Sequence, residues 1–139
     1  MTEKSALTGG CLCGAVRYRC PEPPSPGALC HCTSCRRAAG AHAVAWFTVP
    51  DSTLVFTHGQ PVIFKSSPPV ERSFCARCGT QLTYRNQRWP GEVDITVGSL
   101  DEPARVAPTA HIWMQDAAAW DKPGDGLPRH PRSRLDPTA

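Results

Sequence analysis

The sequence predicts a single all-β domain with little helix, and three observations lead to this fold class. The chain has 139 residues, a length at which one domain can bury its own core. Its 15 prolines favour turns and short strands over long helices. Short stretches with alternating or β-branched residues follow one another, and turn residues separate them. No internal repeat divides the chain.

The predicted strands are short and closely spaced. In the first of them Val16 and Tyr18 lie on one face of an extended segment. A longer β-rich run ends at Pro50, and Pro61 opens a later strand without loss of a ladder hydrogen bond. The other predicted strands cover residues 53–57, 62–65, 71–74, 81–85 and 92–97, with a loop at 66–69.

Helix is predicted only at 33–39. Thr33 or Ser34 is suited to cap its beginning, and Gly40 to end it. The chain is expected to consist of a short lead at 1–8, one domain at 9–131 and a flexible tail at 132–139.

Charge and hydropathy exclude several classes of protein. The net charge is +3, and the basic residues are scattered, a pattern that does not favour a nucleic-acid partner. No stretch approaches the roughly 18 apolar residues that a membrane-spanning helix needs, and residues 1–10 lack the apolar segment of a secretory signal. A cytoplasmic protein without a membrane partner is therefore expected. In that compartment clustered cysteines are typically metal ligands rather than disulfides.

Seven of the eight cysteines fall into three clusters. Cys75 and Cys78 form a C-x-x-C-G motif, in which a tight turn brings two thiolates to one metal ion. Gly79 permits a positive φ, so that backbone N–H groups point at sulfur. Cys11 and Cys13, one residue apart, share a face if the segment is extended, and they are a plausible second pair for a closed four-thiolate structural site.

The third cluster predicts an open site. Cys30 and Cys32 share one face of an extended segment, and Cys35 returns to the same point if a helical turn begins at Thr33. Three protein ligands without a fourth are typical of a catalytic zinc site. A zinc ion there would lower the pKa of a substrate thiol and orient its sulfur.

The spacing of the cysteines alone does not determine which pairs share a metal site. Cys32 and Cys35 with Cys75 and Cys78 would also make a ribbon-like four-cysteine site. Cys20 stands alone, and a buried free thiol is its simplest interpretation.

The clusters together resemble the glutathione-dependent formaldehyde-activating family, which also includes centromere-protein-V-like proteins. The matching stretches are Gly9 to Tyr18, Cys30 to Arg37, Phe74 to Thr80, His111 to Trp113, Trp120 and Asp125 to Pro128. They run in the family's order from about residue 9 to 131. The combination of three cysteine clusters is specific, whereas any one of them alone is not.

The resemblance implies a single-domain β-tent fold, built of short antiparallel strands around a four-cysteine zinc site. It assigns Cys11, Cys13, Cys75 and Cys78 to a structural zinc, and Cys30, Cys32 and Cys35 to a catalytic zinc. Two Zn²⁺ per chain are therefore expected. The implied activity is that of a zinc-dependent carbon–sulfur lyase acting on a thiol–aldehyde adduct such as S-hydroxymethylglutathione, formed from glutathione and formaldehyde.

Two histidines and two alternative functions also follow from the sequence. His42 follows the open site and is the candidate acid–base group, whereas His31 is expected to support the ligands rather than bind metal. The alternative function is a non-catalytic zinc module that binds protein or nucleic acid. A thiol oxidoreductase resembling methionine sulfoxide reductase B would need Cys20 as its nucleophile, and nothing near it in sequence would activate it.

Overall fold

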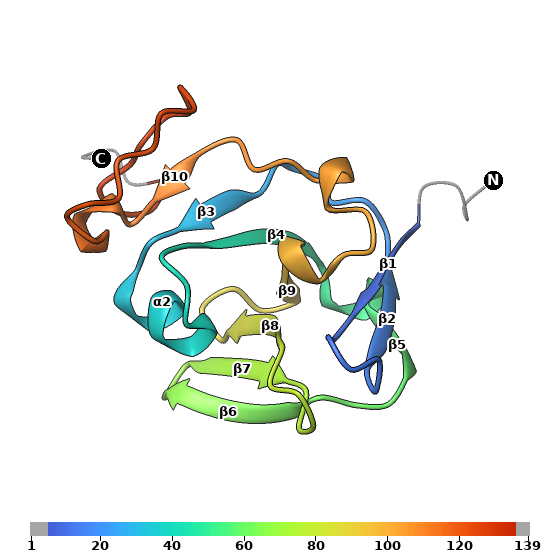
Figure 1. Cartoon of the computed structure of the whole chain (residues 1–139). Helices are drawn as coiled ribbons and strands as arrows, with labels where there is room; N and C mark the ends of the chain where they lie inside the picture. The colour runs from blue at the N-terminus through green and yellow to red at the C-terminus, as the bar shows by residue number, and fades with distance from the viewer. Residues whose placement is uncertain (1–5, 136–139) are drawn as a thin grey trace.

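The computed structural model describes residues 6–135, which form two sheets and one α-helix (Figure 1). The smaller sheet has the order β1-β2-β5, with β2 antiparallel to both neighbours. Its strands are β1 (Leu7–Gly10), β2 (Arg17–Cys20) and β5 (Val55–His58).

The larger sheet has seven strands in the order β10-β3-β4-β9-β8-β7-β6. They are β3 (Ala28–Cys30), β4 (Val44–Pro50), β6 (Val62–Ser67), β7 (Val70–Phe74), β8 (Gln81–Asn86), β9 (Glu92–Thr96) and β10 (His111–Ile112). All neighbouring pairs are antiparallel except β10 with β3, which is parallel. The predicted all-β class with little helix is confirmed.

The two faces of the larger sheet carry separate apolar clusters. On β4, Phe47 and Val49 join the main core, which also contains Tyr18 from the smaller sheet. Val44 and Trp46, which alternate with them along the strand, belong to a second cluster. The main core includes Cys11 and Cys75, and the second cluster includes Cys30 and Cys35. The sheet therefore separates the two predicted cysteine sites.

The helix α2 (Thr33–Ala39) has the predicted bounds but a different cap. Its N-cap is Cys32, whose sulfur accepts a hydrogen bond from the backbone N–H of Cys35 at 3.3 Å. The expectation of Thr33 or Ser34 as cap was wrong, because both residues lie inside the helix. Gly40 ends the helix in the left-handed conformation, as predicted.

Several local expectations differ from the structure. Cys11 and Cys13 lie in the turn between β1 and β2 rather than in a strand. β6 continues to Ser67, so the predicted loop at 66–69 is reduced to a turn at Pro68 and Pro69. The short strands β1, β3 and β10 were not predicted, because strands of two to four residues carry too little periodicity to be recognised in sequence.

The expected segment boundaries stay predictions where the structure does not describe the chain. Residues 1–5 of the expected lead and 136–139 of the expected tail lie outside the described residues. Leu7 and Thr8 already belong to β1, and the side chain of Arg134 donates to the carbonyl oxygen of Gly27 at 3.1 Å. Within residues 6–135, no helix is long and apolar enough to cross a bilayer.

Asp94 on β9 provides a test of stability against pH. Burial raises the pKa of its carboxyl group to about 6, while the hydroxyl of Thr48 donates to it at 2.6 Å. Between the usual pKa of 3.8 and about 6, the folded chain holds a proton that the unfolded chain has released. The contribution of Asp94 to stability therefore falls as the pH rises through this window.

We expect Asp94→Asn to raise the free energy of unfolding at pH 7.5 by about 1–2 kcal/mol and to leave it nearly unchanged at pH 3.5. Urea denaturation at the two pH values measures the difference. An equal effect at both pH values would contradict the assignment, because only the ionised carboxylate is disfavoured by burial.

Candidate metal centres

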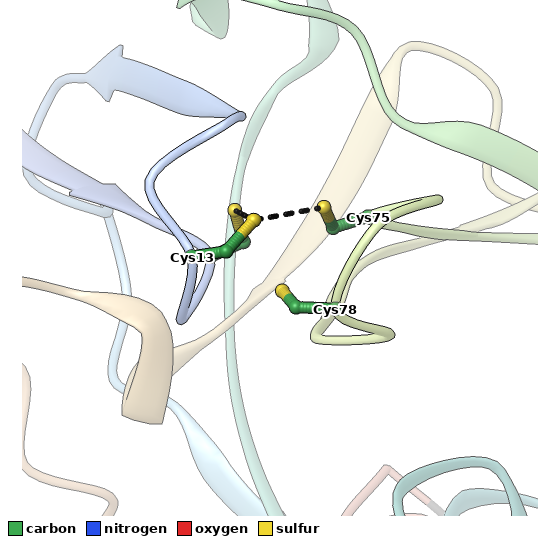
Figure 2. A group of neighbouring side chains, drawn as sticks. Cys13, Cys75 and Cys78 are labelled. Atoms are coloured by element: carbon green, nitrogen blue, oxygen red, sulfur yellow. Dashed lines mark hydrogen bonds between the residues drawn. The ribbon is translucent and has the colours of Figure 1, made fainter.

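Four sulfur atoms meet at the junction of the two sheets. Cys11 and Cys13 come from the β1–β2 turn, and Cys75 and Cys78 from the β7–β8 turn, with all four sulfurs within 4.8 Å of one another. Figure 2 shows the two turns facing each other across this group. Cys13 Sγ lies 3.7 Å from Cys11 Sγ and 3.8 Å from Cys75 Sγ. We call these four residues the closed group.

These separations fit a metal ion rather than a disulfide. A sulfur–sulfur bond is about 2.05 Å long. Four sulfurs at the usual zinc–sulfur distance of about 2.3 Å form a tetrahedron with edges of about 3.8 Å. The closed group has this spacing, so it is preorganised for a tetrahedral ion with four thiolate ligands.

Backbone N–H groups and a hydroxyl surround the closed group. Gly79 has φ +82°, as the C-x-x-C-G motif predicts, and its N–H bonds to the carbonyl oxygen of Cys75 at 2.8 Å. The backbone N–H groups of Val16 and Arg77 donate to Cys11 Sγ and Cys75 Sγ at 3.2 and 3.3 Å. Thr80 Oγ1 accepts from the N–H of Leu12 at 3.0 Å and so joins the two turns.

The other three clustered cysteines form a second group on the opposite face of the larger sheet. Cys30 ends β3, Cys32 caps α2, and Cys35 lies in the first turn of that helix, with all three sulfurs within 4.8 Å. Cys30 and Cys35 are buried, and Cys32 is half-buried. We call them the open group. The structure thus places Cys32 and Cys35 with Cys30, and not with Cys75 and Cys78.

Interactions within the open group favour ionisation at one sulfur. Hydrogen bonding from Cys30 and Cys35 lowers the pKa of Cys32, and the positive charge of Arg72 adds to the effect. The same contacts raise the pKa of Cys30, because its thiol supplies a proton to its neighbours. A thiolate is the form that binds metal, so the group is suited to a cation.

A cavity of about 560 Å³ opens beside the open group, between α2 and strands β6 to β8. Its walls include Phe64 and Phe74, and its polar residues include Arg37, Arg72 and Gln81. No cysteine lines the cavity, but the guanidinium of Arg72 also reaches the sulfur of Cys35, at 3.7 and 3.8 Å from its two Nη atoms. Arg72 therefore connects the cavity with the cysteines.

A row of four titratable side chains ties the open group to the C-terminal segment. His31 Nδ1 lies 3.2 Å from Asp121 Oδ2, and His31 Nε2 lies 2.9 Å from His111 Nδ1. His111 Nε2 lies 2.8 Å from Asp125 Oδ2. Both histidines are buried, and burial lowers the pKa of His31. His31 does not belong to the sulfur cluster, so its ring supports the segment between two cysteines.

We expect His111→Phe to destabilise the protein by about 2 kcal/mol, because it leaves His31 buried without its hydrogen-bond partner. Urea denaturation measures the loss. His58→Phe is the matched control, because His58 is exposed at the end of β5. A loss no larger than that of the control would show that the row does not hold the segment in place.

His42 and Cys20 lie outside both cysteine groups. His42 is exposed, and its ring makes an edge contact with Trp120 at 5.9 Å between centroids. Both rings line a depression of about 300 Å³ together with Arg36 and Arg37. Cys20 is buried in the main core, and burial raises the pKa of its thiol to about 11, so it is not an activated nucleophile.

Sequence reasoning missed Arg72, Asp121 and Asp125. A signal for Arg72 existed, because it is a charged residue on the same face as Phe74 of the strand predicted at 71–74. Asp125 lies in a stretch that matches the family, but the resemblance gave it no role. No local signal pointed to Asp121, whose partner His31 lies far away in the sequence.

A two-sheet β fold with one closed and one open cysteine group defines a small protein with two candidate metal centres. The chain belongs to the glutathione-dependent formaldehyde-activating enzyme family, whose sequence profile matches residues 6–116. A Halomonas elongata protein described as "Putative glutathione-dependent formaldehyde-activating enzyme" is 32% identical over 123 residues, covering 82% of this chain and 78% of that protein.

The fold also has a counterpart among solved structures. The crystal structure of a Rhodobacter sphaeroides protein superposes with a TM-score of 0.59 and 21% sequence identity. The match covers 88% of this chain and 98% of that one. At this identity the similarity concerns the fold.

Proposed function

We propose that the protein is a zinc-dependent carbon–sulfur lyase that interconverts a hydroxymethyl thioether with formaldehyde and a thiol, with glutathione as the thiol. The family description supports enzymatic activity with glutathione and formaldehyde. The observation that carries the proposal is the presence of two unlike cysteine groups in one chain. Four thiolates complete a tetrahedral shell, whereas three leave one position for a substrate atom.

Each group would hold one Zn²⁺. In the open group Cys30, Cys32 and Cys35 are the ligands. The zinc supplies Lewis acidity, which favours the ionised form of a substrate thiol. In the cleavage direction the carbon–sulfur bond breaks, its electron pair goes to sulfur, and the hydroxyl proton leaves as the carbonyl forms. His42 is the proposed acceptor of that proton, because it borders a depression next to α2.

The cavity beside the open group supports a substrate larger than a simple thiol. Arg37 lines it and makes no hydrogen bond or ion pair within residues 6–135, so its guanidinium is available for a carboxylate. Gln81 Oε1 is buried without a hydrogen-bond partner among the described residues and offers an acceptor for an amide N–H. Glutathione carries both groups.

The alternative of a non-catalytic module has less support. It would use the basic tail residues, but Arg129 and Arg134 donate to the carbonyl oxygens of Pro123 and Gly27 within the same chain. The first contact lies within the C-terminal segment and the second joins that segment to Gly27, so both side chains already have partners in the same chain.

Exchange spectroscopy tests the proposal. In a mixture of glutathione and ¹³C-formaldehyde, NMR measures how fast the label passes between free formaldehyde and the adduct. We expect the zinc-loaded protein to increase this rate at least tenfold over buffer, and His42→Ala to lose most of the increase. His58→Ala is the control for a histidine substitution. A rate equal to that of buffer, with two zinc ions bound, would contradict the lyase proposal.

A further inference from the structure

Arg72 is a buried cation whose guanidinium contacts a cysteine sulfur. It lies on β7 with 5% of its surface exposed. Both Nη atoms approach Cys35 Sγ, and Nε donates to Ser66 Oγ at 3.2 Å. The ring of Tyr84 packs against the guanidinium, 5.1 Å from its centre.

No carboxylate within residues 6–135 forms an ion pair with Arg72. Burial of an unpaired guanidinium is strongly unfavourable, since its charge leaves water without compensation. The cysteine that the guanidinium contacts within residues 6–135 belongs to the open group. With a dication bound there, its three thiolates would carry one net negative charge that compensates the guanidinium. Arg72 and the ionised open group therefore stabilise each other.

The two cysteine groups differ in how their charge is compensated. Around a dication, the four thiolates of the closed group leave two negative charges, which backbone N–H groups of Val16 and Arg77 contact. Three thiolates around a dication leave one negative charge in the open group, and the guanidinium of Arg72 cancels it. A further thiolate then enters a neutral site rather than an anionic one.

We propose that Arg72 is a positioning residue that neutralises the open group and thereby makes its fourth position selective for anionic thiolates over neutral ligands. This inference rests on the proposed function, because it concerns the substrate class of the same site. Arg72 acts through Cys35, and its side chain also borders the cavity in which the rest of the substrate would lie.

Cobalt substitution measures this selectivity without any turnover. With Co²⁺ in both groups, titration with 2-mercaptoethanol reports an anionic ligand, and titration with imidazole reports a neutral one. Binding of either ligand changes the absorption of Co²⁺ in the open group, whereas Co²⁺ in the closed group gives a constant background. We expect Arg72→Met to weaken 2-mercaptoethanol binding by at least about tenfold, because it removes the positive charge that lies 3.7 and 3.8 Å from Cys35 Sγ and offsets the charge of the thiolates. Imidazole binding should change less than threefold.

Arg72→Lys and Arg19→Met complete the set. The lysine variant keeps the charge and should keep the preference for the thiol. Arg19 is an exposed arginine on β2, and its substitution should change the binding of neither 2-mercaptoethanol nor imidazole. Equal weakening of both ligands in Arg72→Met would mean that Arg72 only supports the local structure, and an unchanged preference would overturn the proposal directly. If Arg72→Met does not fold, loss of the thiol preference in Arg72→Lys overturns it.

The outcome separates this inference from the lyase proposal. A wild-type protein that prefers the thiol, but does not exchange formaldehyde, refutes the proposed activity and leaves the role of Arg72 intact. A wild-type protein that binds imidazole and not 2-mercaptoethanol refutes both.

Discussion

Cys75→Ser is expected to abolish cooperative folding of the chain. Cys75 is 1% exposed, belongs to the main core and supplies one of the four sulfurs of the closed group. Binding of a structural zinc contributes about 10–16 kcal/mol in small zinc-finger peptides, and whole domains are stable by only about 5–15 kcal/mol. Loss of one ligand therefore removes a contribution as large as the stability of the domain.

Metal analysis and thermal unfolding by circular dichroism measure this effect. The wild-type chain should carry two zinc ions and unfold in one transition, whereas Cys75→Ser should show no sharp transition. Cys20→Ala is the matched control, because it removes a buried sulfur of the same core and should keep both zinc ions, at a cost of about 1–2 kcal/mol. Two zinc ions and an unchanged transition in Cys75→Ser would refute a structural role for the closed group.

Cys32→Ser, unlike Cys75→Ser, should retain the fold but lose the activity. Cys32 is half-buried at the beginning of α2 and contributes to the second apolar cluster only from its edge. A serine hydroxyl still suits the N-cap position, so the helix should persist. The open group keeps only two sulfurs, which is too few to retain zinc against dilution or a mild chelator.

We expect the zinc content of Cys32→Ser to fall from two ions to one, and formaldehyde–glutathione exchange to fall to the rate in buffer. Thermal unfolding should remain cooperative. Cys20→Ala should keep full exchange activity. Loss of both zinc ions together with the fold would mean that Cys32 belongs to the structural centre, contrary to the geometry of the two groups.

The sequence by itself determined the fold class and the chemical character of the cysteine clusters. Alternation such as that of Val16 and Tyr18, which were predicted to share one face, is a local property, and both side chains are buried in the structure. The helix at 33–39 and the positive φ of Gly79 also follow from local preferences, which act within a few residues. Local preference was less reliable for the helix cap, because the cysteine sulfur of Cys32 replaces the expected hydroxyl.

The tertiary structure decided which clusters share a site. C-x-C and C-x-x-C spacing fixes how two sulfurs sit in one turn, but it carries no information on which turns meet. Pairing of β1 with β2 and of β7 with β8 forms the two turns, and packing of the two sheets around the main core brings Cys13 and Cys75 within 3.8 Å although they are 62 positions apart. Cys30, Cys32 and Cys35 remain on the other face of the larger sheet.

The residues around the open group depend on the tertiary structure still more strongly. Arg72 on β7 contacts Cys35 only because α2 packs beside this part of the larger sheet, and His111 reaches His31 only because β10 pairs with β3. The role of a buried charge or imidazole depends on the group that it contacts, and long-range packing rather than neighbouring sequence supplies that group. The sequence thus determined which residues are able to bind metal, and the tertiary structure determined how these residues are grouped and which charges surround them.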